Sequence, residues 1–584
     1  MREYSVPVLV DVPASAGLAD TVFRRAEQEP HVIVMRRKVD GGWPLVTASE
    51  FRDQVVEVAR GLIAAGVGHG DKVALMSRTR YEWTLIDYAI WSVGAVTVPI
   101  YETSSAEQVR WILHDSEAKA IFVELDGHEE VVKEAAPELG HVWRVDGTLE
   151  TGQVTAAEVD ERRKLVTSSD LATIVYTSGT TGRPKGCRIT HDNLLFTALN
   201  VLRGPLEPLF ARKDPAALLF LPLAHIFARM IQVVLFEAGA IIAHTPNMKN
   251  VAPDLQDFKP TFLLGVPRVF EKVYNSAEQK AIAGGKGKIF ASAVDVAVAW
   301  SKAESAGGAP LGLRLRRAVF DKLVYSKLRA ATGGRLTAAV CGGSALGDRL
   351  GHFFRGVGIE VFEGYGLTET SAPCSVNMPG ANKIGTVGKP LPGVTLRIGD
   401  DGEILAKGRN VFEGYWKNDD AIADVIDADG WFHTGDLGEL DADGYLRITG
   451  RKKEILVTAA GKNVAPGPLE DALRAHPLIS QAMVVGDGRP FVAALITLDP
   501  EAMPAGSTVA GLRSDPKVRE EIQAAVDRAN LAVSKAEQIK KFAILDADIT
   551  EESGHLTPTL KIKRSRVMSD FAAQVDDLYG GPRS

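Results

Sequence analysis

Glycine, serine and threonine are concentrated in one short segment, residues 177–186, which reads TSGTTGRPKG and follows the apolar segment 171–176. Glycines let backbone N–H groups turn toward an anion, hydroxyls donate further hydrogen bonds, and a lysine adds a positive charge. The segment therefore predicts a phosphate-binding loop formed by Thr177, Ser178, Gly179, Thr180, Thr181, Gly182 and Lys185. A P-loop NTPase is disfavoured because Lys185 is followed by glycine instead of serine or threonine, and a dinucleotide site because GxGxxG is missing after the strand.

Two later segments carry the groups that a nucleotide needs beyond its phosphates. Residues 363–370, EGYGLTET, supply an aromatic ring for a purine in Tyr365, a hydroxyl for a phosphate in Thr368 and a carboxylate for magnesium in Glu369. Residues 431–436, WFHTGD, place a carboxylate after a turn, where its two oxygens can accept hydrogen bonds from both ribose hydroxyls. The three segments together predict a site for a nucleoside triphosphate.

In this order, the motifs resemble those of the adenylate-forming superfamily, which includes acyl-CoA synthetases, luciferases and the adenylation domains of peptide synthetases. Its phosphate-loop signature, [ST]SGTTGxPKG, is met in full by residues 177–186. The resemblance implies that Glu369 and Thr177 contact magnesium and that His225 lies beside the acyl carboxylate. It also implies a catalytic part for Thr368 and Glu369. The further nucleotide contacts that it implies are Gly343, Ser344, Gly364, Tyr365, Gly366, Asp436 and Arg451.

A basic segment near the end of the sequence, residues 556–564 (LTPTLKIKR), resembles the one that carries the superfamily's catalytic lysine. The resemblance assigns this role to Lys561 and leaves Lys563 as the alternative. Most members have glycine immediately before the lysine, whereas this chain has Leu560. The resemblance also places an interdomain hinge at Lys453.

The reaction implied by the resemblance has two steps and uses Mg²⁺, ATP and coenzyme A. A fatty acid first reacts with ATP to give acyl-AMP and pyrophosphate, and coenzyme A then displaces AMP to give acyl-CoA. Gly461 and Lys462 are implied to line the tunnel that coenzyme A enters. Residues 265–272 (GVPRVFEK) and 461–466 (GKNVAP) resemble segments of bacterial long-chain fatty-acid–CoA ligases, including those of actinobacteria.

Three alternatives stay open beside this reading. A fatty acyl-AMP ligase would stop at the adenylate, and an acyl-carrier-protein synthetase would pass the acyl group to a carrier protein. A nucleotide- or lipid-binding protein without activity would be expected to lack Lys561, Glu369 or a glycine of the loop, yet all of these are present.

The elements that must position these groups alternate between short apolar strands and amphipathic helices, as in 73–76, 81–93 and 96–100. Such alternation predicts βαβ units with mainly parallel sheets. We therefore expect an α/β fold in which a small mobile α+β domain follows a large one. The expected parts are an N-terminal domain at 1–450 with a helical insertion at about 275–335 and a β-rich subdomain at about 385–450, a hinge at 451–453 and a C-terminal domain at 454–584.

Composition narrows the class of protein. With 67 basic and 74 acidic side chains the net charge is −7, which excludes a strongly basic nucleic-acid binder. Three scattered cysteines indicate a reducing, cytoplasmic location. The longest apolar segment, 216–243, is interrupted by Pro222, Arg229 and Glu237 and is expected to be buried core, so any membrane contact should be peripheral. The partners expected are fatty acid, ATP and coenzyme A, and the sequence does not indicate an oligomeric state.

Overall fold

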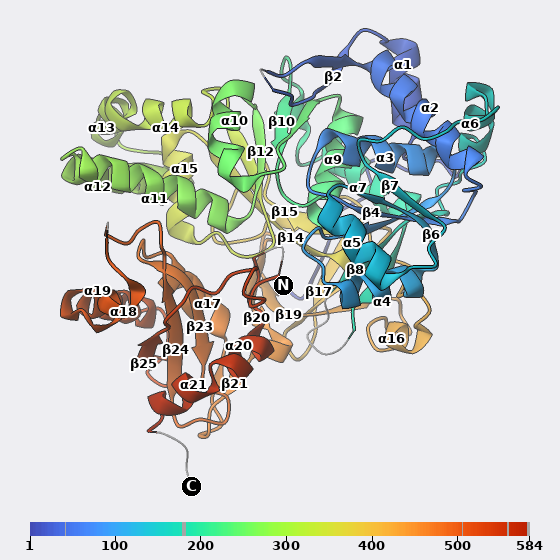
Figure 1. Ribbon diagram of the computed structural model, residues 1–584. Coiled ribbons are helices and arrows are strands. Elements are labelled where there is room, and N and C mark those ends of the chain that lie inside the picture. The colour runs from blue at the N-terminus through green and yellow to red at the C-terminus, as the bar shows by residue number, and fades with distance from the viewer. Residues whose placement is uncertain (41, 178–182, 505, 558–559, 581–584) are drawn as a thin grey trace.

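The computed structural model describes residues 1–40, 42–177, 183–504, 506–557 and 560–580. Sheets of six, nine and five strands belong to the N-terminal part, and a three-stranded sheet belongs to a separate C-terminal unit below them (Figure 1). The expected α/β fold, with a large N-terminal domain and a smaller C-terminal one, is confirmed.

The six-stranded sheet has the order β7-β6-β4-β5-β8-β9 and is parallel except for the pair β8 and β9. Alternate residues of β4 enter two different hydrophobic clusters, because helices cover both faces of the sheet. The strands are β4 (Lys72–Met76), β5 (Val96–Ile100), β6 (Ala118–Val123), β7 (His141–Arg144), β8 (Leu171–Thr177) and β9 (Lys185–Thr190). The helices around them are α2 (Ala48–Ala64), α3 (Tyr81–Ser92), α4 (Ala106–Ser116), α5 (Asp126–Ala135) and α6 (Ala156–Arg163).

The nine-stranded sheet has the order β16-β15-β14-β13-β12-β10-β11-β2-β3, with a parallel centre and antiparallel edges. Its strands are β2 (Ile33–Arg36), β3 (Leu45–Thr47), β10 (Ala216–Leu219), β11 (Ile241–His244), β12 (Phe262–Gly265), β13 (Ala338–Cys341), β14 (Glu360–Leu367), β15 (Ala372–Val376) and β16 (Lys389–Pro390). The helices connecting these strands include α1 (Asp20–Gln28), α7 (His191–Leu202), α8 (Glu207–Phe210), α9 (Ile226–Ala238), α10 (Val251–Phe258) and α15 (Asp348–Val357).

A run of helices connects the parallel neighbours β12 and β13, and the predicted helical insertion falls within it. The run consists of α11 (Pro267–Ala283), α12 (Gly287–Ser305), α13 (Leu311–Phe320), a π-helical turn (Asp321–Tyr325) and α14 (Ser326–Ala331). Glycine pairs separate α11 from α12 and α12 from α13, as the sequence indicates.

The five-stranded sheet is antiparallel throughout and has the order β1-β17-β18-β19-β20. Its strands are β1 (Glu3–Ser5), β17 (Val394–Ile398), β18 (Glu403–Gly408), β19 (Phe432–Leu440) and β20 (Leu446–Arg451), with the short helix α16 (Asp419–Ala423) before β19. Asp-Gly turns at 401–402 and 443–444 connect neighbouring strands of this sheet. The sequence analysis did not predict β1, because three residues are too few to show alternation.

The C-terminal unit is a three-stranded sheet with helices on both faces and a ribbon at one end (Figure 1). Its strands are β21 (Leu456–Val457), β22 (Asn463–Val464), β23 (Ile479–Val485), β24 (Val492–Leu498) and β25 (Ile539–Ile544). Its helices are α17 (Pro466–Arg474), α18 (Val509–Ser514), α19 (Pro516–Asn530), α20 (Arg564–Asp570) and α21 (Ala572–Leu578).

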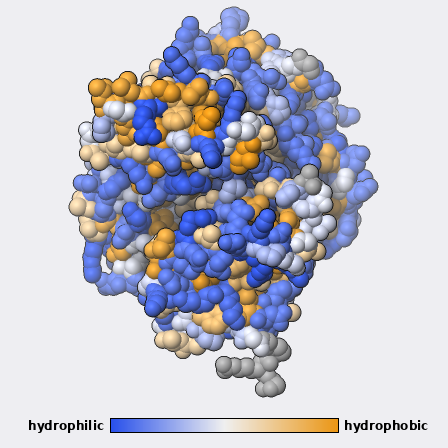
Figure 2. Space-filling model, turned by 90° about the vertical axis from the view of Figure 1, so that its left-hand side faces the viewer, coloured by the Kyte–Doolittle hydropathy of each residue, from blue (hydrophilic) through white to orange (hydrophobic). Residues whose placement is uncertain are grey.

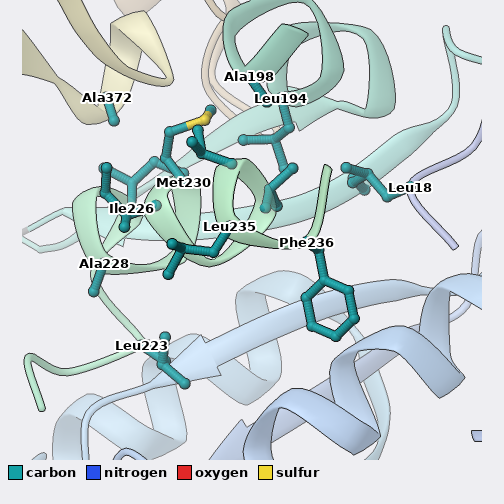
Figure 3. Packing of buried hydrophobic residues seen from close by; sticks show 14 of the residues in the cluster. Leu18, Leu194, Ala198, Leu223, Ile226, Ala228, Met230, Leu235, Phe236 and Ala372 are labelled. Carbon is teal, nitrogen blue, oxygen red and sulfur yellow. The ribbon is translucent and has the colours of Figure 1, made fainter. Parts of the chain in front are cut away.

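Helix α9 lies at the centre of the largest hydrophobic cluster (Figure 3). Met230 of this helix packs near Leu194 and Ala198 of α7, whereas Leu235 points to the other side of the helix, as Figure 3 shows. The apolar segment that contains α9 is therefore buried core, as expected. Among the described residues, no helix is both long enough and apolar enough to cross a bilayer.

Candidate functional site

The predicted phosphate loop connects the antiparallel strands β8 and β9. Thr177, the last residue of β8, pairs with Lys185, the first residue of β9. Ser178, Gly179, Thr180, Thr181 and Gly182 lie outside the described residues. At the end of the loop, the Trp111 indole N–H donates to the carbonyl of Pro184 at 2.9 Å, and the Nζ of Lys185 lies 5.0 Å from the centre of the Tyr415 ring. The two strands thus fix the ends of the loop within the sheet.

Glu369 lies close to the first residue of that loop. It belongs to a short 3₁₀ helix, Thr368–Thr370, that follows β14, and its carboxylate accepts a hydrogen bond of 3.0 Å from the Tyr415 hydroxyl. Burial, and then the negative charge of Glu369, raise the pKa of the Cys187 thiol, and Thr177 is within hydrogen-bonding reach of the same sulfur. Thr177 and Glu369 therefore both act on the same buried sulfur.

The glycines around Tyr365 allow β14 and β15 to approach each other closely. A Cβ atom on Gly366 would lie 1.9 Å from the carbonyl oxygen of Ala372, and one on Gly364 would lie 3.2 Å from that of Ser375. The ladder shifts register between Tyr365 and Gly366. Ser371 and Ala372 then adopt positive φ angles of 52° and 74°, a strained conformation for residues that have a Cβ.

Asp436 connects the aromatic motif to the end of the five-stranded sheet. One carboxylate oxygen accepts from the Tyr365 hydroxyl at 2.7 Å, and the other accepts from Nε of Arg451 at 2.7 Å. Asp436 and Arg451 are paired residues of β19 and β20, so the sheet register fixes their approach. Each carboxylate oxygen has lone pairs left for a further donor such as a ribose hydroxyl.

The loop after β13 contains Gly343 and Ser344 and lies at the carboxyl end of the nine-stranded sheet. Gly343 has a φ angle of 88°, and both residues are exposed. The loop ends at Leu346, whose backbone N–H donates to the carboxyl group of Glu363 at 2.8 Å. Burial raises the pKa of Glu363 to about 7. The loop is thus held by a carboxyl group from the neighbouring strand.

His225 caps the N-terminus of α9. Its Nδ1 accepts a hydrogen bond of 3.1 Å from the backbone N–H of Phe227, so the proton of the neutral ring is on Nε2. Burial, followed by the positive charge of Lys561, lowers the pKa of His225 to about 3. Lys561 belongs to the C-terminal unit, so the two domains meet at this histidine.

Lys561 is the residue of the C-terminal unit that reaches the N-terminal site. Desolvation and then the positive charge of Arg451 lower its pKa, while the carboxylates of Asp436, Glu454 and Glu369 act in the opposite direction. The residue is nevertheless accessible to solvent. Lys563, the alternative, precedes α20 and donates its backbone N–H to the carbonyl of His555 at 2.8 Å. The contacts of Lys563 thus lie within the C-terminal unit.

Comparison with known proteins gives matches over nearly the whole chain. Residues 22–416 match the AMP-binding enzyme family, and residues 453–582 match the AMP-binding enzyme C-terminal domain. The chain belongs to the AMP-binding enzymes. The adenylate-forming resemblance drawn from the motifs is confirmed.

This AMP-binding enzyme is 52% identical over 602 residues to the protein named long-chain-fatty-acid–CoA ligase FadD15 of Mycobacterium bovis, with 99% of this chain and all of that protein covered. It is 30% identical over 606 residues to the human protein named long-chain-fatty-acid–CoA ligase ACSBG1, with 94% and 83% covered. Among solved structures, the anthranilate CoA ligase AuaEII in complex with anthranoyl-AMP has a TM-score of 0.72 at 20% identity, with 96% of this chain and 98% of that chain covered. The likeness to that structure concerns the fold.

Among the predicted site residues of this AMP-binding enzyme, Tyr365, Asp436 and Arg451 are joined by hydrogen bonds, whereas two others lie apart from them. Gly461 and Lys462 lie in the turn between β21 and β22, where Gly461 has a φ angle of 77° and Lys462 is 3.6 Å from Glu537. Within the described parts of the chain, no hydrogen bond or ion pair joins these two residues to the nucleotide motifs. Lys453 is exposed in a 3₁₀ helix, Lys452–Glu454, between β20 and β21.

The sequence analysis missed two residues of this site. Tyr415 contacts Glu369 and lies near Lys185, and it comes from the irregular segment between β18 and β19. Glu454, whose charge acts on Lys561, directly follows the predicted hinge. Neither residue belongs to a motif of suggestive composition, so only the fold reveals them.

Proposed function

We propose that this AMP-binding enzyme is a long-chain fatty-acid–CoA ligase that consumes ATP and releases AMP and pyrophosphate. The printed names of the relatives, including one at 52% identity over nearly the whole of both chains, support this substrate class. The observation that supports the mechanism is that the charge of Lys561, a residue of the C-terminal unit, interacts with those of Arg451, Asp436 and Glu369.

In the first step, a carboxylate oxygen of the fatty acid attacks the α-phosphorus of ATP, and the bond from that phosphorus to pyrophosphate breaks. The reacting groups are all negatively charged, so positive groups at the site must offset their repulsion. Lys561 would bridge the fatty-acid carboxylate and the α-phosphate, and Lys185 would add a positive charge at the phosphate loop. His225 stays neutral at physiological pH and adds no charge beside the acyl carboxylate.

Magnesium fits the donor set of this site. Glu369 and Thr177 offer one carboxylate and one hydroxyl, and Mg²⁺ commonly takes one or two carboxylates and completes its shell with water and substrate phosphates. These two residues would hold the ion, which supplies positive charge to the phosphates. Tyr365, Asp436 and Arg451 would hold the nucleoside, with the carboxylate of Asp436 on the ribose hydroxyls.

In the second step, the thiol of coenzyme A attacks the acyl carbon and AMP leaves with the electron pair of the broken C–O bond. Lys561 is not needed for this step, and the site needs a path for the pantetheine arm. The C-terminal unit would turn about Lys453, withdraw Lys561 and bring Gly461 and Lys462 to the site. The protein would work in the cytoplasm, with peripheral contact to the membrane in which long-chain acids partition.

Mass spectrometry of the products tests the function. The protein is mixed with magnesium, ATP and fatty acids of increasing chain length, with and without coenzyme A. Acyl-CoA and AMP that form only with coenzyme A are expected, whereas adenylate without acyl-CoA would indicate an acyl-AMP ligase. The absence of both products would overturn the proposed substrate class.

A matched pair of lysine variants tests the assignment of the catalytic lysine. Lys561→Ala is expected to lower adenylate formation by about 10³-fold or more while sparing thiolysis of supplied acyl-AMP. Lys563→Ala, two residues away, should retain most of the adenylation rate. Equal losses in both variants would refute the assignment to Lys561.

A further inference from the structure

The helical run from α13 to α14 has apolar side chains on two sides, but within the described chain only one of these sides packs against a hydrophobic cluster. Phe320, Val324 and Leu328 pack against the hydrophobic cluster around α12 and α15, and Tyr325 is fully buried in it. A surface helix normally has one apolar stripe and a polar opposite face. The second apolar side of this helix therefore has no role in the packing of this chain.

That second side is a regular stripe of exposed aliphatic residues. They occur at every fourth position, and their exposed fractions are 74% for Leu311, 61% for Leu315, 57% for Val319 and 52% for Leu323. At a rise of about 1.5 Å per residue, the stripe is roughly 18 Å long. Figure 2 views the face of the molecule that carries this helical run and shows hydrophobic side chains gathered within a hydrophilic surround.

The surroundings of the stripe are strongly basic. Residues 280–331 contain ten lysine and arginine residues and three acidic ones, a net charge of +7 within a chain whose net charge is −7. At about 100° per residue, Arg314 and Arg316 lie on opposite sides of the stripe. Among the described residues, Arg316, Lys322 and Lys327 have no ion-pair partner, whereas Arg314 is 3.8 Å from Glu304. The basic groups are thus available to an external anion.

We propose that the stripe Leu311, Leu315, Val319 and Leu323, with its flanking arginines and lysines, binds the surface of an anionic lipid bilayer. A helix with an exposed apolar face and basic flanks lies in the interface between headgroups and acyl chains, where both kinds of side chain are satisfied. The charge disfavours a second copy as the occupant. A two-fold interface would place this patch of +7 against an identical patch.

The position of the surface links it to the candidate site. The helical run connects β12 to β13, and the loop with Gly343 and Ser344 directly follows β13. In open parallel sheets, ligands bind beyond the carboxyl ends of the strands. The helices that carry the stripe thus belong to the crossover whose second strand leads into a loop of the candidate site. Lipid binding itself does not depend on the proposed ligase activity.

Vesicle sedimentation tests the proposal without any need for catalysis. The full chain is mixed with phosphatidylcholine vesicles that contain about 30 mol% phosphatidylglycerol and with vesicles of phosphatidylcholine alone. We expect binding to the anionic vesicles that is roughly tenfold or more stronger than to the neutral ones and that weakens as salt is added. The absence of binding to the anionic vesicles would overturn the proposal.

Two variants test whether vesicle binding depends on this stripe or on exposed hydrophobic side chains in general. Leu315→Asp/Val319→Asp is expected to weaken vesicle binding by roughly tenfold or more, because it places charges in the apolar stripe. Leu165→Asp changes a residue that is 71% exposed on another part of the molecule and should bind like the parent protein. Unchanged binding of the double variant, or equal loss in both variants, would overturn the proposal. The thermal midpoint and adenylate formation from a water-soluble acid check that each variant is folded.

Light scattering tests the alternative that the stripe binds a second copy of this chain instead of a lipid bilayer. If the parent protein is a dimer that Leu315→Asp/Val319→Asp converts to a monomer, and if vesicles do not bind either form, the stripe is an interface between copies and the lipid proposal is wrong. The same oligomeric state for both proteins, together with the loss of vesicle binding in the variant, supports it.

Discussion

The carboxyl group of Glu363 offers a single-residue test of how the loop after β13 is held. Burial raises its pKa to about 7, so in the native protein it gains a proton that the unfolded chain has lost above about pH 4.5. Its contribution to stability is therefore full below about pH 4.5 and is lost as the pH rises through about 7. A shift of this size corresponds to roughly 3 kcal/mol of unfolding free energy.

Glu363→Gln should remove this dependence, because its amide oxygen can still accept from the Leu346 N–H and does not ionise. Urea unfolding at about pH 5 and about pH 8 measures the effect. We expect the variant to gain roughly 2–3 kcal/mol relative to the parent protein between the two pH values. An identical difference in stability at both pH values would contradict this prediction.

Leu560 provides a second residue-scale prediction, because its φ angle of 61° is left-handed. This conformation costs a residue with a side chain about 1 kcal/mol. Leu560→Gly should leave the unfolding free energy within about 0.5 kcal/mol of that of the parent protein, since the relieved strain offsets the added flexibility.

Leu560→Val should slow adenylation by about tenfold or more and spare thiolysis, because a β-branched residue displaces the backbone of Lys561. Similar adenylation rates in the two variants would show that the backbone conformation is unimportant.

The individual groups of the site could be predicted largely because each one lies in a short segment of unusual composition. Tyr365, Asp436 and Lys561 are examples, and they are now seen to act on one another. Tyr415 could not be predicted, because its contact with Glu369 depends on how an irregular segment crosses the sheet. Sequence spacing carries no information about such an approach.

At the scale of elements, a buried ion pair joins α3 to α9. Arg229 donates to Asp87 at 2.9 Å and 2.5 Å, both side chains are fully buried, and the hydroxyls of Thr173 and Thr97 complete the network. Removing one partner leaves an uncompensated charge in the core. Arg229→Met should therefore lower the unfolding free energy by about 3–5 kcal/mol.

A double-mutant cycle measures the coupling in this pair. Arg229→Met/Asp87→Leu should recover most of the loss, because a pair of apolar residues of similar volume leaves no buried charge. Chemical denaturation of the two single variants and the double variant provides the data. Additive losses would mean that the two helices are joined by other contacts.

The elements that could be predicted from the sequence are those whose pattern reflects local burial. Strands β4 and β5 are mostly apolar, and the sequence predicts their bounds to within a residue. Strand β9 begins Lys185-Gly186 and has no such pattern, because its pairing with β8 determines its conformation. Helix α19 ends at Asn530, whose side chain is hydrogen-bonded to both backbone groups of Ile539, a long-range contact that no local pattern indicates.

At the scale of the whole molecule, polar contacts between the two domains hold Lys561 at the site. Arg268 of α11 donates to Asp499 of the C-terminal unit at 2.7 Å, and both side chains are mostly buried. If the C-terminal unit alternates between two positions, this pair stabilises the adenylation position alone. Arg268→Ala should then slow adenylation by roughly tenfold and leave thiolysis unchanged.

Two further variants test the specificity of this effect. Lys272→Ala breaks a neighbouring interdomain pair with Glu501 that is largely exposed, and it should change the rate by less than about threefold. Arg268→Asp/Asp499→Arg should restore part of the adenylation rate. Equal slowing of both half-reactions by Arg268→Ala would show that the pair acts on folding instead of on the domain position.

The pairing of strand β1 with β17 affects the order in which the chain can fold during synthesis. Residues 3–5 pair with residues 395–397, so the first strand that leaves the ribosome has to wait for a partner encoded some 390 residues later. At 5–20 residues per second, that delay is roughly 20–80 s. During this interval the five-stranded sheet cannot form, whereas the six-stranded sheet can already be complete. Folding of the nascent chain can therefore begin around residues 72–190, and strand β1 is paired only much later.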